Sequence, residues 1–163
     1  MPRRELIVDP TLYDENKPIA DIEEIRRYNS QRFEMEQLTG ILYENFEEKT
    51  AVGYLDTSDK SFWVRGHMPD FPLMPGVIMC EAAAQVTGFF ANKFDLMSGC
   101  LIGLGGIDAV RFRGVVRPGD RFIVQVKAVH CKKFLLTAEF VGLVGRSIVC
   151  EGIVKGVPLS NRD

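Results

Sequence analysis

Four residues in one stretch of the chain have the types and spacing needed for acid–base chemistry on a carbonyl compound. His67 lies in a loop with three prolines, and Gly76 follows the last of them, where a helix is expected to begin. Glu81 and Gln85 are four residues apart in that helix and therefore share one face. A base, an acid and a carbonyl-polarising group suit removal of a proton beside a carbonyl, with loss or gain of a leaving group.

Each residue type suggests a role. Imidazole changes charge near neutral pH, so His67 is the candidate base. The unpaired N–H groups and positive dipole end of a helix N-terminus make Gly76 the candidate that polarises a carbonyl or holds an oxyanion. Apolar surroundings favour the protonated form of a carboxylic acid, so Glu81 is the candidate acid. Gln85 is expected to support the others by hydrogen bonding.

The same residues also have structural interpretations. A lone histidine in a loop is commonly a hydrogen-bonded or surface residue. Glu81 could pair with Arg111 or Arg113 for structural reasons. The prolines could simply shape the loop. Residue types and spacing alone leave these alternatives open.

The stretch that begins at Gly76 predicts a buried helix. Its sequence, VIMCEAAAQVTGFFAN, is apolar on every side apart from Glu81 and Gln85. A helix of this kind is buried in a core or spans a membrane. It is too short and interrupted for the roughly twenty apolar residues that a span requires, so burial in a globular core is expected.

The segments around this helix are expected to be an arm, a short helix and several strands. An irregular arm is expected over residues 1–18, and a short amphipathic helix from about 20 to 28. Strands are predicted in ILYENFEE, TAVGYLD and SFWVR before the central helix. After it, strands are predicted in LIGLGG and IDAVRFRG, joined through glycines, and a turn in VRPGD.

Apolar and polar residues alternate most clearly in the C-terminal third. The residues that point to one side are Phe122, Val124, Val126 and Ala128, with Gln125 and Lys127 on the other. The segments KFLLTAEFVGLV and SIVCEGIVKGV continue as strands. Such strands predict an antiparallel sheet with one buried face, which the apolar helix would cover. The predicted fold is α+β, an antiparallel sheet wrapped around one buried helix, as a single domain over residues 19–163.

Composition excludes several classes of protein. The chain has 163 residues, is 46% hydrophobic and carries a net charge of −2, which fits one globular domain and excludes a nucleic-acid-binding charge pattern. No apolar segment follows Arg3 and Arg4, so no signal peptide is expected. The four cysteines are expected to be free thiols in the reducing cytoplasm. With no CxxC spacing and two histidines, no metal site is expected.

The stretch GHMPDFPLMPGVIMCEAAAQVTG resembles the signature of the FabZ-type (3R)-3-hydroxyacyl-acyl-carrier-protein dehydratases, in which GHFPxxPxxPGVLxxEAxAQ recurs. The similarity continues through GGIDAVRFRGVVRPGDRF to VCEG and covers about residues 20–155. The resemblance implies the hotdog fold, in which an antiparallel sheet wraps around a long central helix. It also implies a hydro-lyase of fatty acid biosynthesis that uses no cofactor.

The implied reaction is dehydration of a 3-hydroxyacyl thioester to the trans-2-enoyl thioester. By matching positions, His67 is the histidine that removes the C2 proton, and Glu81 is the carboxylate that helps the hydroxyl group leave. Gly76 matches the glycine whose N–H polarises the thioester carbonyl, and Gln85 matches a supporting glutamine. A glutamate at position 81 resembles the FabZ branch, because the FabA branch carries aspartate there.

The resemblance also implies partners. The substrate would arrive on acyl carrier protein, and the chain would form a homodimer in which His67 of one subunit meets Glu81 of the other. Such dimers assemble further into hexamers, as trimers of dimers. Residues that could dock the acidic carrier are Arg111, Arg113, Arg117, Arg121, Lys132 and Lys133. A solvated strand face is the competing interpretation of these cations.

Some positions depart from the family pattern. Met68 replaces the usual phenylalanine, and Asp70 with Phe71 replaces a glycine-containing pair. The family's PHRFPFLLVD segment is SQRFEMEQLTG here, with polar residues at several apolar positions. These changes leave substrate identity and acyl chain length open. They also leave two alternatives: another hotdog thioester enzyme, such as a thioesterase or hydratase, or a non-catalytic acyl-binding subunit.

Overall fold

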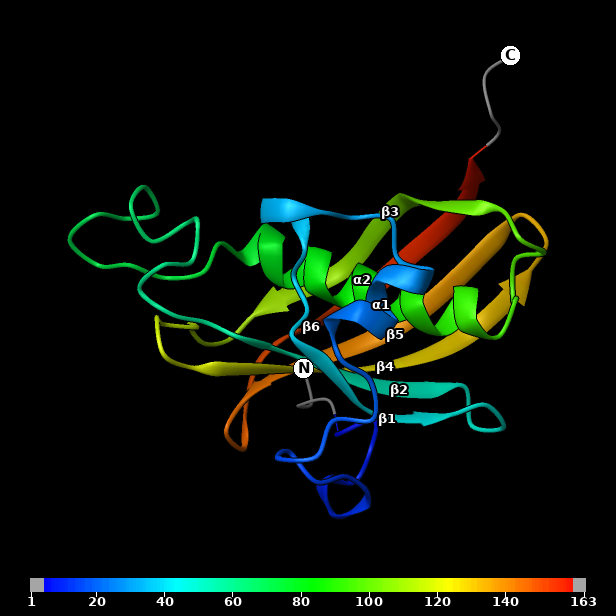
Figure 1. Ribbon diagram of the computed structural model, residues 1–163, viewed down its shortest axis with the longest axis horizontal. Helices are drawn as coiled ribbons and strands as arrows, with labels where there is room; N and C mark the ends of the chain where they lie inside the picture. Colours follow the sequence, from blue (N-terminus) through cyan, green and yellow to red (C-terminus); the bar gives the residue numbers. More distant parts are fainter. Residues whose placement is uncertain (1–4, 160–163) are drawn as a thin grey trace.

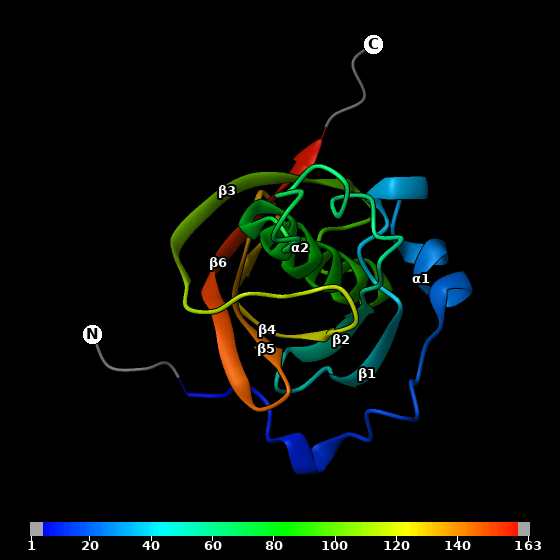
Figure 2. The ribbon, with the colours of Figure 1, turned by 90° about the vertical axis from the view of Figure 1, so that its left-hand side faces the viewer.

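A six-stranded antiparallel sheet carries the fold in the computed structural model, which describes residues 5–159 (Figure 1). The strands are β1 (Gly40–Asn45), β2 (Thr50–Asp56), β3 (Leu101–Phe112), β4 (Arg121–Lys132), β5 (Leu135–Val144) and β6 (Ser147–Leu159). Their order across the sheet is β1-β2-β4-β5-β6-β3. The sheet curls around helix α2 (Gly76–Lys93), as the end view in Figure 2 shows. The predicted α+β architecture is confirmed.

Helix α2 is the centre of the core. It begins at Gly76, directly after Pro75 in an extended conformation, and its three consecutive alanines favour the helical state. Phe89 and Phe90 are fully buried against the inner face of the sheet. Strand β2 approaches the helix so closely that a Cβ on Gly53 would lie 2.6 Å from Val86. Glycine is therefore required at that point of the strand.

The prediction that only one face of the sheet is buried was wrong. Gln125, expected to face solvent, is 0% exposed. Its amide oxygen accepts hydrogen bonds from the N–H groups of Ile7 (2.9 Å) and Val8 (3.0 Å), and its amide nitrogen donates to the carbonyl of Val8 (2.8 Å). The N-terminal arm thus lies across the outer face of the sheet and seals a second apolar cluster there.

The arm is irregular apart from a 3₁₀ turn at Pro10–Leu12. Arg121 holds its far end by donating to the carbonyl of Glu15 while it pairs with Asp56. The predicted arm, 1–18, and domain, 19–163, extend into residues 1–4 and 160–163, which lie outside the described residues.

Two strand predictions need correction. The segment SFWVR forms consecutive turns, because the hydroxyl groups of Ser58 and Ser61 accept hydrogen bonds from nearby backbone N–H groups and compete with strand pairing. The two strands expected to meet at glycines form one strand, β3. Its pairing with β6 shifts register near Gly105 and again near Ala109, so the glycines mark an irregularity within the strand.

The predicted short helix is present as α1 (Ile22–Tyr28), with the carboxylate of Asp21 accepting from the N–H of Glu24 at its start. A 3₁₀ turn, η2 (Phe33–Met35), follows it, and both lie against α2. Within residues 5–159, no helix combines the length and the apolar character needed to cross a bilayer.

Candidate active site

His67 lies in a turn-rich loop that is anchored in the core on both sides of the histidine. Trp63 and Met74 on either side of it are buried in the core. The backbone N–H of His67 donates to the carbonyl of Trp63 (2.7 Å), and its carbonyl accepts from the N–H of Leu73 (3.0 Å). The ring Nδ1 lies 2.9 Å from the carbonyl oxygen of Leu73. A carbonyl only accepts, so Nδ1 carries the proton and Nε2 of the neutral ring is the basic nitrogen.

Gly76 is the first residue of α2, and no side chain caps this end of the helix. The first N–H groups of a helix have no partner within it and carry the positive end of the dipole. The ring of Phe112 covers the α-carbon of Gly76, since a Cβ there would lie 2.6 Å from a ring atom. The position is thus a helix N-terminus that an aromatic ring shields on one side.

Glu81 and Gln85 are brought together on one face of α2. Nε2 of Gln85 donates to Oε1 of Glu81 over 2.8 Å. The same nitrogen donates to the carbonyl of Met35 (2.6 Å), and Oε1 of Gln85 accepts from the N–H of Gln37 (2.8 Å). These bonds fix the orientation of the Gln85 amide. Gln85 therefore holds one oxygen of Glu81, and within residues 5–159 no hydrogen bond to the other oxygen is present.

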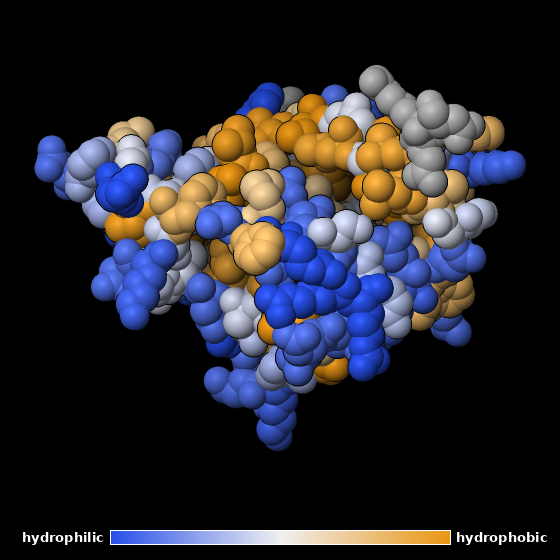
Figure 3. Space-filling model, turned by 45° about the horizontal axis from the view of Figure 1, so that its top comes forward, coloured by the Kyte–Doolittle hydropathy of each residue, from blue (hydrophilic) through white to orange (hydrophobic). Residues whose placement is uncertain are grey.

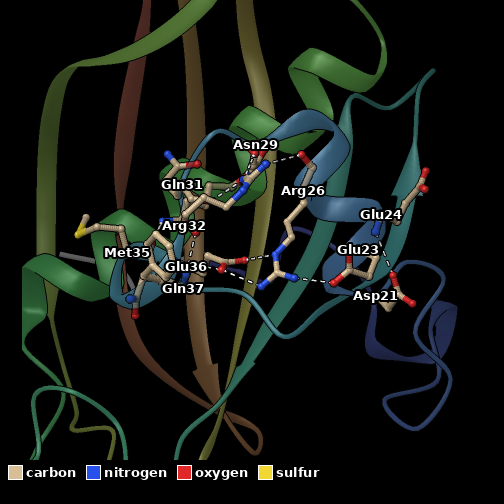
Figure 4. A network of polar contacts seen from close by, with 12 residues as sticks. Asp21, Glu23, Glu24, Arg26, Asn29, Gln31, Arg32, Met35, Glu36 and Gln37 are labelled. Atoms are coloured by element: carbon tan, nitrogen blue, oxygen red, sulfur yellow. Dashed lines mark hydrogen bonds and ion pairs between the residues drawn. The ribbon is translucent and has the colours of Figure 1, made fainter.

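The segment that holds Gln85 is itself fixed by a polar network (Figure 4). Arg26 on α1 makes a two-point ion pair with Glu36, at 2.8 and 2.9 Å. Arg32 donates to the carbonyls of Asn29 (2.7 Å) and Arg26 (3.1 Å). The hydrogen bond from Arg26 is the main cause that lowers the pKa of Glu36, which keeps this carboxyl charged. The network connects α1 to Glu81 through η2 and Gln85.

A cavity of about 150 Å³ opens beside Glu81. Its walls come from α2, from β3 and β6, and from the end of α1. Glu81 is half-buried at its edge rather than sealed in the core. His67 and Gly76 do not belong to the lining of this cavity. A single subunit therefore joins Glu81 to Gln85 at a cavity and leaves His67 outside it.

The structural alternative for Glu81 was wrong for both arginines. Arg113 pairs with Glu151 (2.7 Å), and Arg111 donates to the carbonyl of Val110 (2.9 Å). Gln85 takes the place expected for an arginine. Phe71, at the position that departs from the family pattern, lies under the guanidinium group of Arg117, 5.3 Å from the ring centroid.

Several residues that support the site were not predicted from the sequence. Met35 and Gln37 act through backbone atoms, so their side-chain types carry no signal. Arg26 and Glu36 lie ten residues apart in different elements, and each is an ordinary surface charge by type. Among the described residues, no group of three or more histidine, cysteine or carboxylate side chains could hold a metal ion.

The fold and site define a class: an antiparallel sheet wrapped around one helix that carries an amide-held carboxylate at a cavity. This is the hotdog class. The dehydratase heterocomplex ApeI:P from Xenorhabdus doucetiae has this fold, with a TM-score of 0.69 at 16% identity, over 84% of this chain and 91% of that one.

The FabA-like domain model matches residues 29–153. A 3-hydroxyacyl-[acyl-carrier-protein] dehydratase FabZ of Caldanaerobacter subterraneus is 40% identical over 63% of this chain and 72% of the relative. The FabZ protein of Francisella philomiragia is 32% identical over 85% of this chain and 91% of the relative. The chain belongs to the FabZ family of dehydratases. The predicted family, fold and hydro-lyase class are thereby confirmed.

Proposed function

We propose that this protein dehydrates (3R)-3-hydroxyacyl thioesters on acyl carrier protein to trans-2-enoyl thioesters, in fatty acid biosynthesis. The observation that carries the proposal is the amide-held carboxyl group of Glu81 at the edge of a cavity. Family membership supports the same proposal, because the relatives are 3-hydroxyacyl-[acyl-carrier-protein] dehydratases.

The chemistry assigns one step to each group. Nε2 of His67 removes a proton from C2, and the electrons of the C–H bond form the C2–C3 double bond. The N–H of Gly76 stabilises the charge that develops on the thioester oxygen. Glu81, directly or through water, gives a proton to the C3 hydroxyl, so the C3–O bond breaks and water leaves. Gln85 holds Glu81 in position for this transfer.

The site is proposed to be completed in a homodimer. The cavity that Glu81 borders lacks the base, and β3 is an unpaired edge of the sheet. Exposed apolar side chains along this edge are Leu101, Leu104, Ile107 and Phe112. Figure 3 shows hydrophobic residues gathered on this side of the molecule. A long apolar edge strand is a strong candidate for pairing with a second copy. His67 of one subunit would then meet Glu81 of the other, and such dimers could assemble as hexamers.

The carrier protein would bind to exposed cations of this chain. Arg113 and Arg121 already pair with Glu151 and Asp56, so they contribute less to such a surface. The exposed cations that fit it are Arg111, Arg117, Lys132 and Lys133.

All four cysteines are free, which suits a cytoplasmic location.

The test follows the absorbance of the conjugated enoyl thioester with purified protein and 3-hydroxyacyl carrier-protein substrates of several lengths. Formation of the enoyl product is expected. Release of free thiol without an enoyl signal would indicate a thioesterase instead. Tight acyl binding without turnover, unchanged in His67→Ala and Glu81→Ala, would indicate a non-catalytic binding subunit.

A further inference from the structure

The ring of Phe112 is in contact with the residue at which α2 begins. Phe112 is the last residue of β3, and the end of this strand and the start of α2 lie at the same end of the molecule (Figure 1). Three atoms at the tip of the ring, Cζ, Cε1 and Cε2, lie 2.6, 2.7 and 2.9 Å from the place that a Cβ on Gly76 would take. The ring thus occupies the space of the side chain that Gly76 lacks.

The start of α2 presents two backbone donors. The carbonyl of Pro75 accepts hydrogen bonds from the N–H groups of Ile78 (2.9 Å) and Met79 (3.3 Å). In the part of the chain that the structure describes, the N–H groups of Gly76 and Val77 have no hydrogen-bond partner, as is usual in the first turn of a helix. These two groups are therefore the donors that a carbonyl oxygen of a ligand could use.

Glycine needs outside contacts to hold such a donor in one direction. It has no Cβ, so steric contacts restrict its φ and ψ angles less than those of any other residue. Two contacts limit this freedom at Gly76. The N–H of Met74 donates to the carbonyl of Val116 (2.8 Å), and the ring of Phe112 packs on Gly76 itself. The segment from Phe112 to Val116 therefore holds the entry to α2 at two points.

The segment that carries Phe112 is itself anchored to β6. The N–H groups of Arg113 (2.7 Å) and Gly114 (3.1 Å) both donate to the carbonyl of Val149. The guanidinium group of Arg113 also pairs with Glu151 (2.7 Å). Because the backbone beside Phe112 is fixed in this way, its ring can restrain the residue that it touches.

We propose that Phe112 is a positioning residue of the active site. Its ring holds the first turn of α2 so that the N–H of Gly76 points at the thioester carbonyl, and it keeps water away from this N–H. The inference rests on the proposed dehydration, because that reaction supplies the carbonyl that Gly76 polarises. A donor that is fixed before charge develops needs no reorganisation in the transition state, and it acts more strongly where water is excluded.

The first test compares Phe112→Leu with Phe46→Leu. Both phenylalanines are 52% exposed, and Phe46 contacts Phe94, directly after the other end of α2, with ring centroids 5.0 Å apart. Leucine keeps an apolar side chain at each position and removes the ring.

Phe112→Leu is expected to lower kcat for a 3-hydroxyacyl pantetheine thioester about tenfold and to change KM less than about twofold, because the donor acts on charge that develops in the transition state. Phe46→Leu should keep kcat within about twofold of the wild type. Equal losses of kcat in the two variants would overturn the inference.

A double-mutant cycle separates action through Gly76 from a general loss of packing. A methyl group on residue 76 displaces the ring of Phe112, since ring atoms already occupy its place. Gly76→Ala should therefore remove the same contact, so that addition of Phe112→Leu lowers kcat by less than about a further twofold. If Phe112→Leu lowers kcat by the same factor with Gly76 and with alanine at this position, the two residues act independently and the inference fails.

An infrared measurement reports the polarisation itself and needs no turnover. The probe is a saturated acyl pantetheine thioester, isotope-labelled at its carbonyl carbon, which has no 3-hydroxyl group to lose. On the wild type its carbonyl stretch should shift to lower frequency, and at least about half of this shift should be lost in Phe112→Leu but kept in Phe46→Leu. An unchanged shift in Phe112→Leu, or a wild type without a shifted band, would overturn the inference.

Failure of the proposed function gives a different result. If the wild type turns over no 3-hydroxyacyl thioester of any length, dehydration itself fails. The infrared comparison still decides the role of Phe112, because it depends on binding alone. Loss of the shift in Phe112→Leu then supports the action of the ring on Gly76, and an equal shift rejects it.

Discussion

Nε2 of Gln85 donates to Oε1 of Glu81 across 2.8 Å, one turn apart on α2. The second bond of this nitrogen, to the carbonyl of Met35, fixes which way the amide points. The carboxylate is thus held by a group that is itself held by the backbone of another segment. Glu81 itself lines the cavity, so this chain of hydrogen bonds fixes a carboxyl group at the cavity edge.

Replacement of Gln85 by leucine should damage both catalysis and stability. The N–H of Gln37 and the carbonyl of Met35 would lose their partner, which costs about 1–3 kcal/mol for each group that stays buried. Because Glu81 would lose its donor, kcat should fall about ten- to a hundredfold. Enoyl absorbance and urea unfolding measure the two effects. Gln37→Leu keeps its backbone N–H and should retain most of the activity; equal losses in both variants would contradict this role.

A site shared between subunits predicts complementation. His67→Ala and Glu81→Ala should each lower kcat by at least about a hundredfold. When the two variants are co-expressed, a mixed dimer contains one site with both native residues and one with neither. Random mixing should therefore restore about a quarter of the wild-type activity. If co-expression restores nothing although mixed dimers are recovered, each site lies within one subunit.

The Arg26–Glu36 pair predicts how stability changes with pH. The hydrogen bond from Arg26 lowers the folded-state pKa of Glu36 below its ordinary value of 4.5. A depressed carboxyl pKa contributes stability above the ordinary value, and this contribution is lost as pH falls through the folded value. Glu36→Gln should be less stable than the wild type at pH about 7, and the difference should shrink below pH 4.5. Urea titrations across this range measure it, and a constant difference would contradict the assignment.

The N-terminal arm should detach when Gln125 is replaced. Gln125→Leu removes the partner of two N–H groups and one carbonyl on the arm. The free energy of unfolding should fall by about 1–3 kcal/mol, and the arm should become sensitive to protease while dehydration continues. Lys127→Ala changes an exposed residue on the same face and should stay within about 0.5 kcal/mol of the wild type. If the arm of Gln125→Leu stays resistant to protease, contacts other than Gln125 hold the arm on the sheet.

The parts of the fold that depend on periodicity were predictable, and those that depend on distant partners were not. The apolar stretch from Gly76 defined the central helix, and alternation defined β4 and β5. Gln125 was misjudged because its partner is the backbone of the arm, more than a hundred residues away. A polar residue type in a strand predicts solvent unless such a partner is known.

In the candidate site, too, some residues were predictable from the sequence and others were not. The spacing of His67, Gly76, Glu81 and Gln85 was visible in the sequence and in the resemblance. Their supports were not visible, because Leu73, Met35 and Gln37 act through backbone atoms. A main-chain group is present at every position, so residue type cannot indicate which one is used.

The pairing of β2 with β4 bears on how the chain folds. Thr50 pairs with Lys127 and Asp56 with Arg121, and α2 lies between the two strands in the sequence. Closing such long loops costs entropy before the contacts form. The sheet cannot complete its curl without enclosing α2, so strand closure and burial of the helix are expected as one cooperative event. Refolding should therefore take about milliseconds to seconds rather than the microseconds typical of helical bundles.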